Sequence, residues 1–208
     1  MSKGRMEAFS DGVLAVIITI MVLEMKAPHG TDLAALRPVL PVFCSYVLSF
    51  VYVGIYWNNH HHLLHAAQHV TGGILWANLH LLFWLSLSPF ATAWVGESYP
   101  APWPVAVYGT VFLFAGIAYF LLTRTLVARH GPGSVLAQSI GNDRKGKASV
   151  LLYMAAIPLS FVQPWIAVVG YLVVAVLWLL PDRRIERTLS SHHPSTTPTP
   201  TPPGDGAG

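Results

Sequence analysis

Cysteine and charged residues are scarce in this chain of 208 residues. The single cysteine, Cys44, excludes an internal disulfide and any cysteine-based metal cluster. Charged residues make up 10% of the chain, whereas soluble domains contain about 25%. Apolar residues make up 53%, seven residues are tryptophan, and the mean hydropathy is +0.52. This composition predicts an integral membrane protein.

Apolar runs long enough to cross a bilayer, which requires about 20 residues, recur along the chain. They lie near residues 6–26, 39–60, 72–96, 104–126 and 148–181. The last run is too long for one crossing and is interrupted by Pro158 and by the Gln163–Pro164 step. We therefore expect two short helices there, 148–163 and 165–181, and an all-α protein with six transmembrane helices.

The basic residues are placed unevenly between the loops. A net charge of +3 and a pI near 9.1 would suggest a nucleic-acid partner in a soluble protein, but here no nucleic acid is expected. With the N-terminus inside, only Lys26 and Arg37 of the 12 basic residues fall outside. The positive-inside rule then predicts a cell-membrane protein with both termini cytoplasmic. Its basic inner loop, residues 129–147, can face anionic lipid headgroups.

The chain is expected to form one membrane domain followed by a tail. The first apolar run follows Asp11 and shows no signal-peptide cleavage pattern, so this helix is expected to stay in the mature protein. We assign residues 1–189 to a six-helix domain. Residues 190–208 are rich in Pro, Thr and Gly and are predicted to be a disordered cytoplasmic tail. No internal repeat is evident.

The first apolar run begins with Arg5, Glu7, Ser10 and Asp11, and charge at a spanning helix is costly unless it is partnered. Further along, four residues recur at i, i+3, i+4 and i+7 and share one helical face: Val16, Thr19, Ile20 and Leu23. Asp11 lies about 140° from Val16 around the helix axis. The stripe and the carboxylate therefore face different neighbours.

Four short motifs in this order are informative together. Arg5, Phe9, Ser10 and Asp11 spell R-x-x-x-F-S-D at the first helix. The others are Tyr56-Trp57-x-x-His60-His61, Asn78-Leu79 and Ser88-Pro89-Phe90. With these motifs the chain resembles the prokaryotic branch of the transmembrane-protein-175 family of potassium channels. The resemblance covers about the first hundred residues by motif and the rest by layout.

The resemblance implies a passive, potassium-selective channel with potassium ions as the permeant species, no cofactor and no catalytic residue. In the family, four subunits form a homotetramer whose first helices surround the pore, and the pore-lining positions correspond here to Val16, Thr19, Ile20 and Leu23. Such apolar rings can close a pore by dewetting. Thr19 either offers its hydroxyl oxygen to the ion or bonds back to the carbonyl of Ala15. From the residues alone, packing against an apolar neighbour is the alternative for this stripe.

The resemblance also implies a structural polar network around the first helix. In it Asp11 is neutralised by Arg5 and by donors of the second and third helices, which correspond to Trp57, His60, His61 and Asn78. Phe9 and Ser10 belong to the same motif. On chemistry alone, the alternative is an interfacial helix start in which Ser10 and Asp11 are caps and Arg5 reaches the headgroups.

A histidine cluster suggests two further alternatives. His61, His65 and His69 lie at i, i+4 and i+8, with His62 beside them. Such spacing can bind a metal, but a membrane iron enzyme needs several separated histidine boxes, so neither a metal site nor an enzyme is expected. A proton-coupled transporter using Asp11 and the histidines is the main alternative function. It is disfavoured because no inverted repeat or broken helix pair marks a central site.

Overall fold

The computed structural model describes residues 2–67, 69–131 and 144–180. The predicted tail, 190–208, and most of the basic inner loop lie outside these residues. Within the described ranges, every regular element is a helix. The helices are α1 Lys3–Leu23, the short 3-10 helix η1 Leu33–Val39, α2 Leu40–Ala66, α3 Gly72–Ser86, α4 Ser88–Ser98, α5 Pro102–His130, α7 Arg144–Leu159 and α8 Pro164–Leu179.

Four helical stretches of the described chain are long and apolar enough to cross a membrane. They are Lys3–Leu23, Leu33–His65, Gly72–Ser98 and Pro102–Arg129. The helix α8 is a shorter apolar helix of 16 residues. The all-helical fold is thus as predicted, and the four long stretches coincide with the first four predicted spans.

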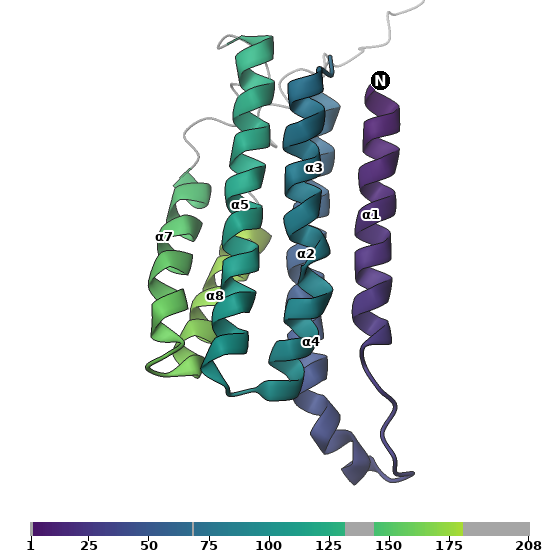
Figure 1. The fold of residues 1–208 in the computed structure, drawn as a ribbon, viewed down its shortest axis with the longest axis vertical. Coiled ribbons are helices and arrows are strands. Elements are labelled where there is room, and N and C mark those ends of the chain that lie inside the picture. Colours follow the sequence, from purple (N-terminus) through teal and green to yellow (C-terminus); the bar gives the residue numbers. More distant parts are fainter. Residues whose placement is uncertain (1, 68, 132–143, 181–208) are drawn as a thin grey trace, which may run out of the picture.

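The third predicted span consists of two helices. α3 ends at Ser86 and α4 begins at Ser88, with Leu87 between them. Pro89 lies in the first turn of α4, where the missing proline N–H has no intrahelical partner to lose. The backbone therefore breaks at Leu87 while the chain continues in the same direction (Figure 1).

The predicted break in the last apolar run is present. The helix α7 ends at Leu159, one residue after Pro158 and four residues before the predicted end at 163, and α8 starts at Pro164, one residue before the predicted start. Residues 160–163 form the turn between them. Pro158 and Pro164 favour a turn here because neither has a backbone N–H to donate to the preceding helical turn.

The helices form a bundle in which α1 lies on one side and α7 and α8 lie on the other (Figure 1). α1 packs on α2, α3 and α4, whereas α5 packs on α3, α4, α7 and α8. The α1 side is filled mainly by leucine, isoleucine and methionine. The α5–α8 side contains four buried tyrosines, Tyr52, Tyr108, Tyr153 and Tyr171.

Candidate pore-lining helix and its polar contacts

One face of α1 packs against the rest of the subunit. Its buried side chains recur every three or four residues and so form one stripe along the helix: Met6, Ser10, Leu14, Ile17 and Met21. Ser10 is the only polar member and is fully buried. This apolar stripe fixes the rotation of α1 about its own axis.

The opposite face of α1 is uncovered in the subunit. Val16, Ile20 and Leu23 are 54%, 41% and 77% exposed, and Thr19 is exposed beside them. A Cβ at Gly12, on the same face, would meet nothing within 4 Å. The four predicted pore residues therefore share one open face.

The Thr19 hydroxyl donates to the backbone carbonyl of Val16 at 2.8 Å. The sequence-based alternative named the Ala15 carbonyl, one residue earlier, and the i−3 bond replaces it. Because this bond uses the hydroxyl hydrogen, the oxygen keeps lone pairs that can face a cation.

A buried relay of hydrogen bonds joins α1, α2 and α3. His60 Nε2 and Asn78 Oδ1 are 2.7 Å apart, and Asn78 Nδ2 donates to Ser10 Oγ at 2.9 Å. Ser10 Oγ donates in turn to the Met6 carbonyl at 2.9 Å. His60, Asn78 and Ser10 are each at most 2% exposed, so the relay is shielded from solvent.

The direction of this relay follows from its last bond. Since the Ser10 hydroxyl uses its hydrogen on Met6, it accepts from Asn78. The Asn78 amide is then oriented with its oxygen toward His60, whose Nε2 must be protonated. The buried Nδ1 of His60 has no hydrogen-bond partner in the described part of the chain.

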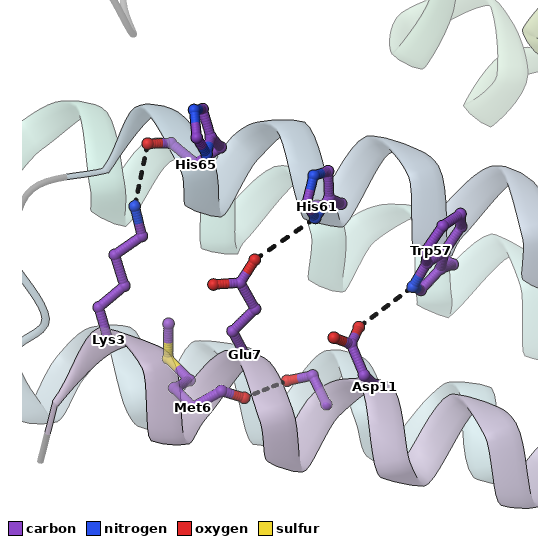
Figure 2. A network of polar contacts seen from close by, with 8 residues as sticks. Lys3, Met6, Glu7, Asp11, Trp57, His61 and His65 are labelled. Carbon is purple, nitrogen blue, oxygen red and sulfur yellow. Dashed lines mark hydrogen bonds and ion pairs between the residues drawn. The ribbon is translucent and has the colours of Figure 1, made fainter.

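Three further contacts between α1 and α2 form a ladder nearer the surface (Figure 2). Lys3 Nζ donates to the His65 carbonyl at 3.0 Å, and Trp57 Nε1 donates to Asp11 Oδ1 at 3.1 Å. Between them, Glu7 Oε1 lies 3.4 Å from His61 Nδ1. The α1 residues are four apart and their α2 partners run four apart in the reverse order. Antiparallel helices bring such residues into successive contact because each step of four is about one turn.

The structure thus divides the predicted network into two sets. Trp57 reaches Asp11, but His60 and Asn78 bond to each other and to Ser10, and His61 meets Glu7. Glu7 and Lys3 were not predicted as members. Their four-residue spacing with Asp11 is the signal that could have identified them.

Arg5 and Phe9 lie on the open face of α1 and not in either set. Phe9 is 51% exposed and Arg5 is exposed. Six residues separate Arg5 from Asp11, which places them about 120° apart around the helix. Within the described part of one subunit, no ion pair or hydrogen bond of the Arg5 side chain is found. Arg5 instead continues the line of Val16 and Leu23 toward the N-terminal end.

The histidine rings near the end of α2 contact one another, His61 and His65 in a stack and His61 and His62 edge to face. The ring centroids of His61 and His65 are 6.2 Å apart, and those of His61 and His62 are 5.7 Å apart. His80 lies on α3 and accepts from Trp84 Nε1 at 3.0 Å. No group of three or more His, Cys, Asp or Glu side chains placed to hold a metal ion occurs in the described ranges.

The comparisons with known proteins point to one family of channels. A family model described as "Endosomal/lysosomal potassium channel TMEM175" matches residues 5–89. A protein of Chryseobacterium sp. (strain P1-3), named a potassium channel, is 53% identical over 192 residues, which are 92% of this chain and 100% of that protein. A protein of Gallus gallus, named an endosomal/lysosomal proton channel TMEM175, is 39% identical over 75 residues, covering 30% of this chain and 15% of its own length.

A solved structure has a similar fold. It is the crystal structure of a lysosomal potassium-selective channel TMEM175 homolog from Chamaesiphon minutus. The TM-score is 0.70 at 28% sequence identity, with 85% of this chain and 96% of that chain covered. The similarity therefore extends well beyond the region matched by the family model.

Proposed function

The chain belongs to the TMEM175 family of channels, and from this premise we propose that it is a potassium channel that conducts passively. Its relatives are named as ion channels and not as enzymes. The pore is formed by the α1 helices of four identical subunits and is lined by Val16, Thr19, Ile20 and Leu23. The observation that supports this most directly is the open face of α1, on which these four residues lie.

A single subunit leaves this face without a protein neighbour, and four copies around an axis would cover it. Apolar rings from Val16, Ile20 and Leu23 would then narrow a water-filled path. A narrow apolar ring holds no stable water column, so it can stop ions without a plug. Thr19 would supply a ring of hydroxyl oxygens whose lone pairs are not used by the bond to Val16.

Six crossings per subunit complete the proposed topology. The helices α7 and α8 have 16 residues each, or about 24 Å at 1.5 Å per residue, somewhat shorter than a hydrocarbon core of about 30 Å. Short helices are accommodated by local thinning of the bilayer. Both termini then lie in the cytoplasm, as the distribution of Lys and Arg favours.

The polar contacts of α1 serve structure in this proposal. The Ser10, Asn78 and His60 relay and the Asp11–Trp57 bond hold the N-terminal half of α1 on α2 and α3. The pore-lining residues, Val16 to Leu23, follow Asp11 along α1 and so lie beyond these contacts. A pore helix held on one face presents the other face to the axis.

Flux through purified protein in liposomes that hold a potassium gradient tests the proposal. Wild type is compared with Ile20→Asn and Leu23→Asn, and Val22→Asn is the matched control. Val22 is 41% exposed and lies outside the stripe, about 60° from Thr19, its nearest member, and about 100° from Leu23 around the helix. We expect the two stripe variants to change the potassium rate or to admit sodium, while the control stays at the wild-type rate. Potassium flux that is absent, or unaffected by both stripe variants, would contradict the pore assignment.

The same liposomes should be measured with and without a pH gradient. The reason is specific: the vertebrate relatives are named proton channels, and Glu7 meets His61 at the N-terminal end of α1. Potassium movement that requires a pH gradient and ignores the stripe would favour the proton-coupled transporter using Asp11 and the histidine cluster. Potassium movement without a pH gradient favours the passive channel.

A further inference from the structure

A cavity of about 460 Å³ lies between α2, α5, α7 and α8. This volume is within the range of about 300–1,000 Å³ found for small-molecule sites. The helices α7 and α8 are on the side of the subunit away from α1 (Figure 1). The cavity is therefore separate from the stripe and from the polar contacts of α1.

The wall of the cavity is almost entirely apolar and aromatic. Leu113, Ile117, Val150, Val174 and Trp178 are among the side chains that line it. Three exposed lining residues mark its rim on α5 and α7: Phe120, Lys147 and Leu151. Such a wall suits a hydrocarbon chain, because each buried methylene contributes about 0.8 kcal/mol of hydrophobic free energy.

One polar group in this wall lacks a partner. Tyr153 is 3% exposed, and its hydroxyl makes no hydrogen bond within the described part of the chain. The Tyr52 phenol, which donates its own hydrogen to the Tyr171 carbonyl, is close enough to interact with the Tyr153 hydroxyl, but the two do not meet hydrogen-bond geometry. A buried hydroxyl without a partner destabilises the protein. An acceptor on a ligand, such as an ester carbonyl, would remove that cost.

A cation lies at the rim nearest the start of α7. Lys147 is exposed and lines the cavity six residues before Tyr153, which is about 9 Å along the helix axis. In the proposed topology this end of α7 faces the cytoplasm. A lysine there attracts the phosphate of an anionic lipid.

We propose that this cavity binds an anionic glycerophospholipid of the cytoplasmic leaflet. One acyl chain occupies the apolar space, an ester carbonyl accepts from the Tyr153 hydroxyl, and the phosphate lies beside Lys147. The assignment of the leaflet rests on the proposed topology. The binding itself is independent of which ion the protein conducts.

The charge at the rim is tested by native mass spectrometry of the full chain. Protein from detergent solution is mixed with phosphatidylglycerol or phosphatidylcholine, and the retained lipid is counted per subunit. Wild type is expected to retain phosphatidylglycerol in preference. Lys147→Gln should lower this preference about fivefold, the effect of one basic residue at a lipid surface. Arg37→Gln, which removes one positive charge from an exposed residue outside the cavity and on the predicted outer side, should leave the preference unchanged.

The apolar space is tested by filling it. A Cβ at Gly116 would meet only the Tyr56 hydroxyl, at 3.6 Å, so Gly116→Leu fits at the backbone and projects among the lining side chains. We expect it to abolish lipid retention. The control is Gly73→Leu, since Gly73 does not line the cavity and its Cβ would meet only Thr125 at 3.9 Å.

If Gly116→Leu does not fold, Tyr153→Phe tests whether the cavity binds a lipid ester. It removes one oxygen and should reduce retention of both lipids, because both contain the ester. Unchanged retention in Tyr153→Phe, wild-type retention in Gly116→Leu, or equal retention of the two lipids by wild type would each overturn the proposal. Because the readout is lipid mass and not ion flux, such a result leaves the channel proposal standing.

Discussion

The helices α1 and α5 are both long and apolar, yet the subunit holds them in different ways. In an apolar segment of 18 residues, 50% of the residues of α5 are buried, against 28% of those in the equivalent segment of α1. α5 is surrounded by helices and fixed by close aromatic packing, as where Tyr108 and Phe112 contact Tyr52 and Tyr171. α1 is packed on one face, and its polar contacts to α2 and α3 lie at one end. The comparison indicates that α5 is the scaffold and that α1 has a face left for other copies.

Removing the centre of the buried relay should have the largest effect on this difference. Asn78→Leu leaves the Nε2–H of His60 without an acceptor and Ser10 without a donor. Leaving buried polar groups unpaired costs about 1–3 kcal/mol each, so we expect a loss of about 3 kcal/mol and detachment of α1. Thermal unfolding in detergent measures it.

The matched control for Asn78→Leu is the triple variant Ser10→Ala, His60→Leu, Asn78→Leu. It removes the whole relay at once, and replacing all partners by apolar groups can be nearly neutral. If the triple variant is as unstable as the single one, the unpaired groups are not the cause.

Crowding α5 should have the next largest effect. A Cβ at Gly109 would overlap the hydroxyl of Tyr171, which itself donates to the Val105 carbonyl at 3.1 Å. Gly109→Ala should therefore destabilise the protein by about 2 kcal/mol, as overpacking does. Gly12→Ala is the same change on the open face of α1, where helix propensity alone would stabilise the subunit by about 1 kcal/mol. Equal melting temperatures for these two variants would remove the contrast between the helices.

Loss of the indole donor to Asp11 should be smaller. Trp57→Phe keeps an aromatic ring but removes the Nε1–H that Asp11 accepts at 3.1 Å. Trp57 is 47% exposed, so solvent can replace the bond in part, and we expect a loss of about 1 kcal/mol. A loss as large as that of Asn78→Leu would show that Asp11 is better shielded in the assembled protein than in one subunit.

The smallest effect is expected from Glu7→Gln. Glu7 lies 3.4 Å from His61 Nδ1, and the two side chains are 26% and 46% exposed. Exposed ion pairs contribute about 0–1 kcal/mol, and salt screens them. The stability difference from wild type should therefore shrink as salt is added. A difference that is independent of salt would mean a hydrogen bond without an ionic component.

The periodicity of the sequence was sufficient for the helices and for placing Val16, Thr19, Ile20 and Leu23 on one face of α1. That this face is left open was implied by the family resemblance, since the residues alone allowed packing as well. The stripe from Val16 to Leu23 lies on the open face because Met6, Ser10 and Leu14 alternate with it at helical spacing. The gathering of Ser10, Asn78 and His60 was expected from the motifs. That these three residues form a set separate from Asp11 was not expected, because it depends on how α2 and α3 are rotated about their axes relative to α1.

Other features depend on packing among several helices and leave no local pattern. The placement of Arg5 differs from the expectation because a residue six positions before Asp11 points elsewhere. The unpartnered Tyr153 hydroxyl and the cavity beside it arise where four helices fail to fill the space between them. The break at Leu87 was visible only as the Ser88-Pro89 step.

The distribution of contacts along α1 has a mechanical consequence. The polar contacts that join α1 to α2 and α3 all lie between Lys3 and Asp11 in the described residues, while Leu23 is 12 residues further on. That segment is about 18 Å long, and apolar packing of Leu14, Ile17 and Met21, without polar contacts to α2 or α3, holds it on the bundle. A tilt of about 10° about the polar contacts would carry Leu23 sideways by about 3 Å. It would keep the contacts to α2 and α3 but disturb the apolar packing of Met21 and its 3.8 Å contact with the Thr92 hydroxyl of α4. Rotation of the helix about its axis would instead pull Ser10 away from Asn78, so tilt and rotation disturb different sets of contacts.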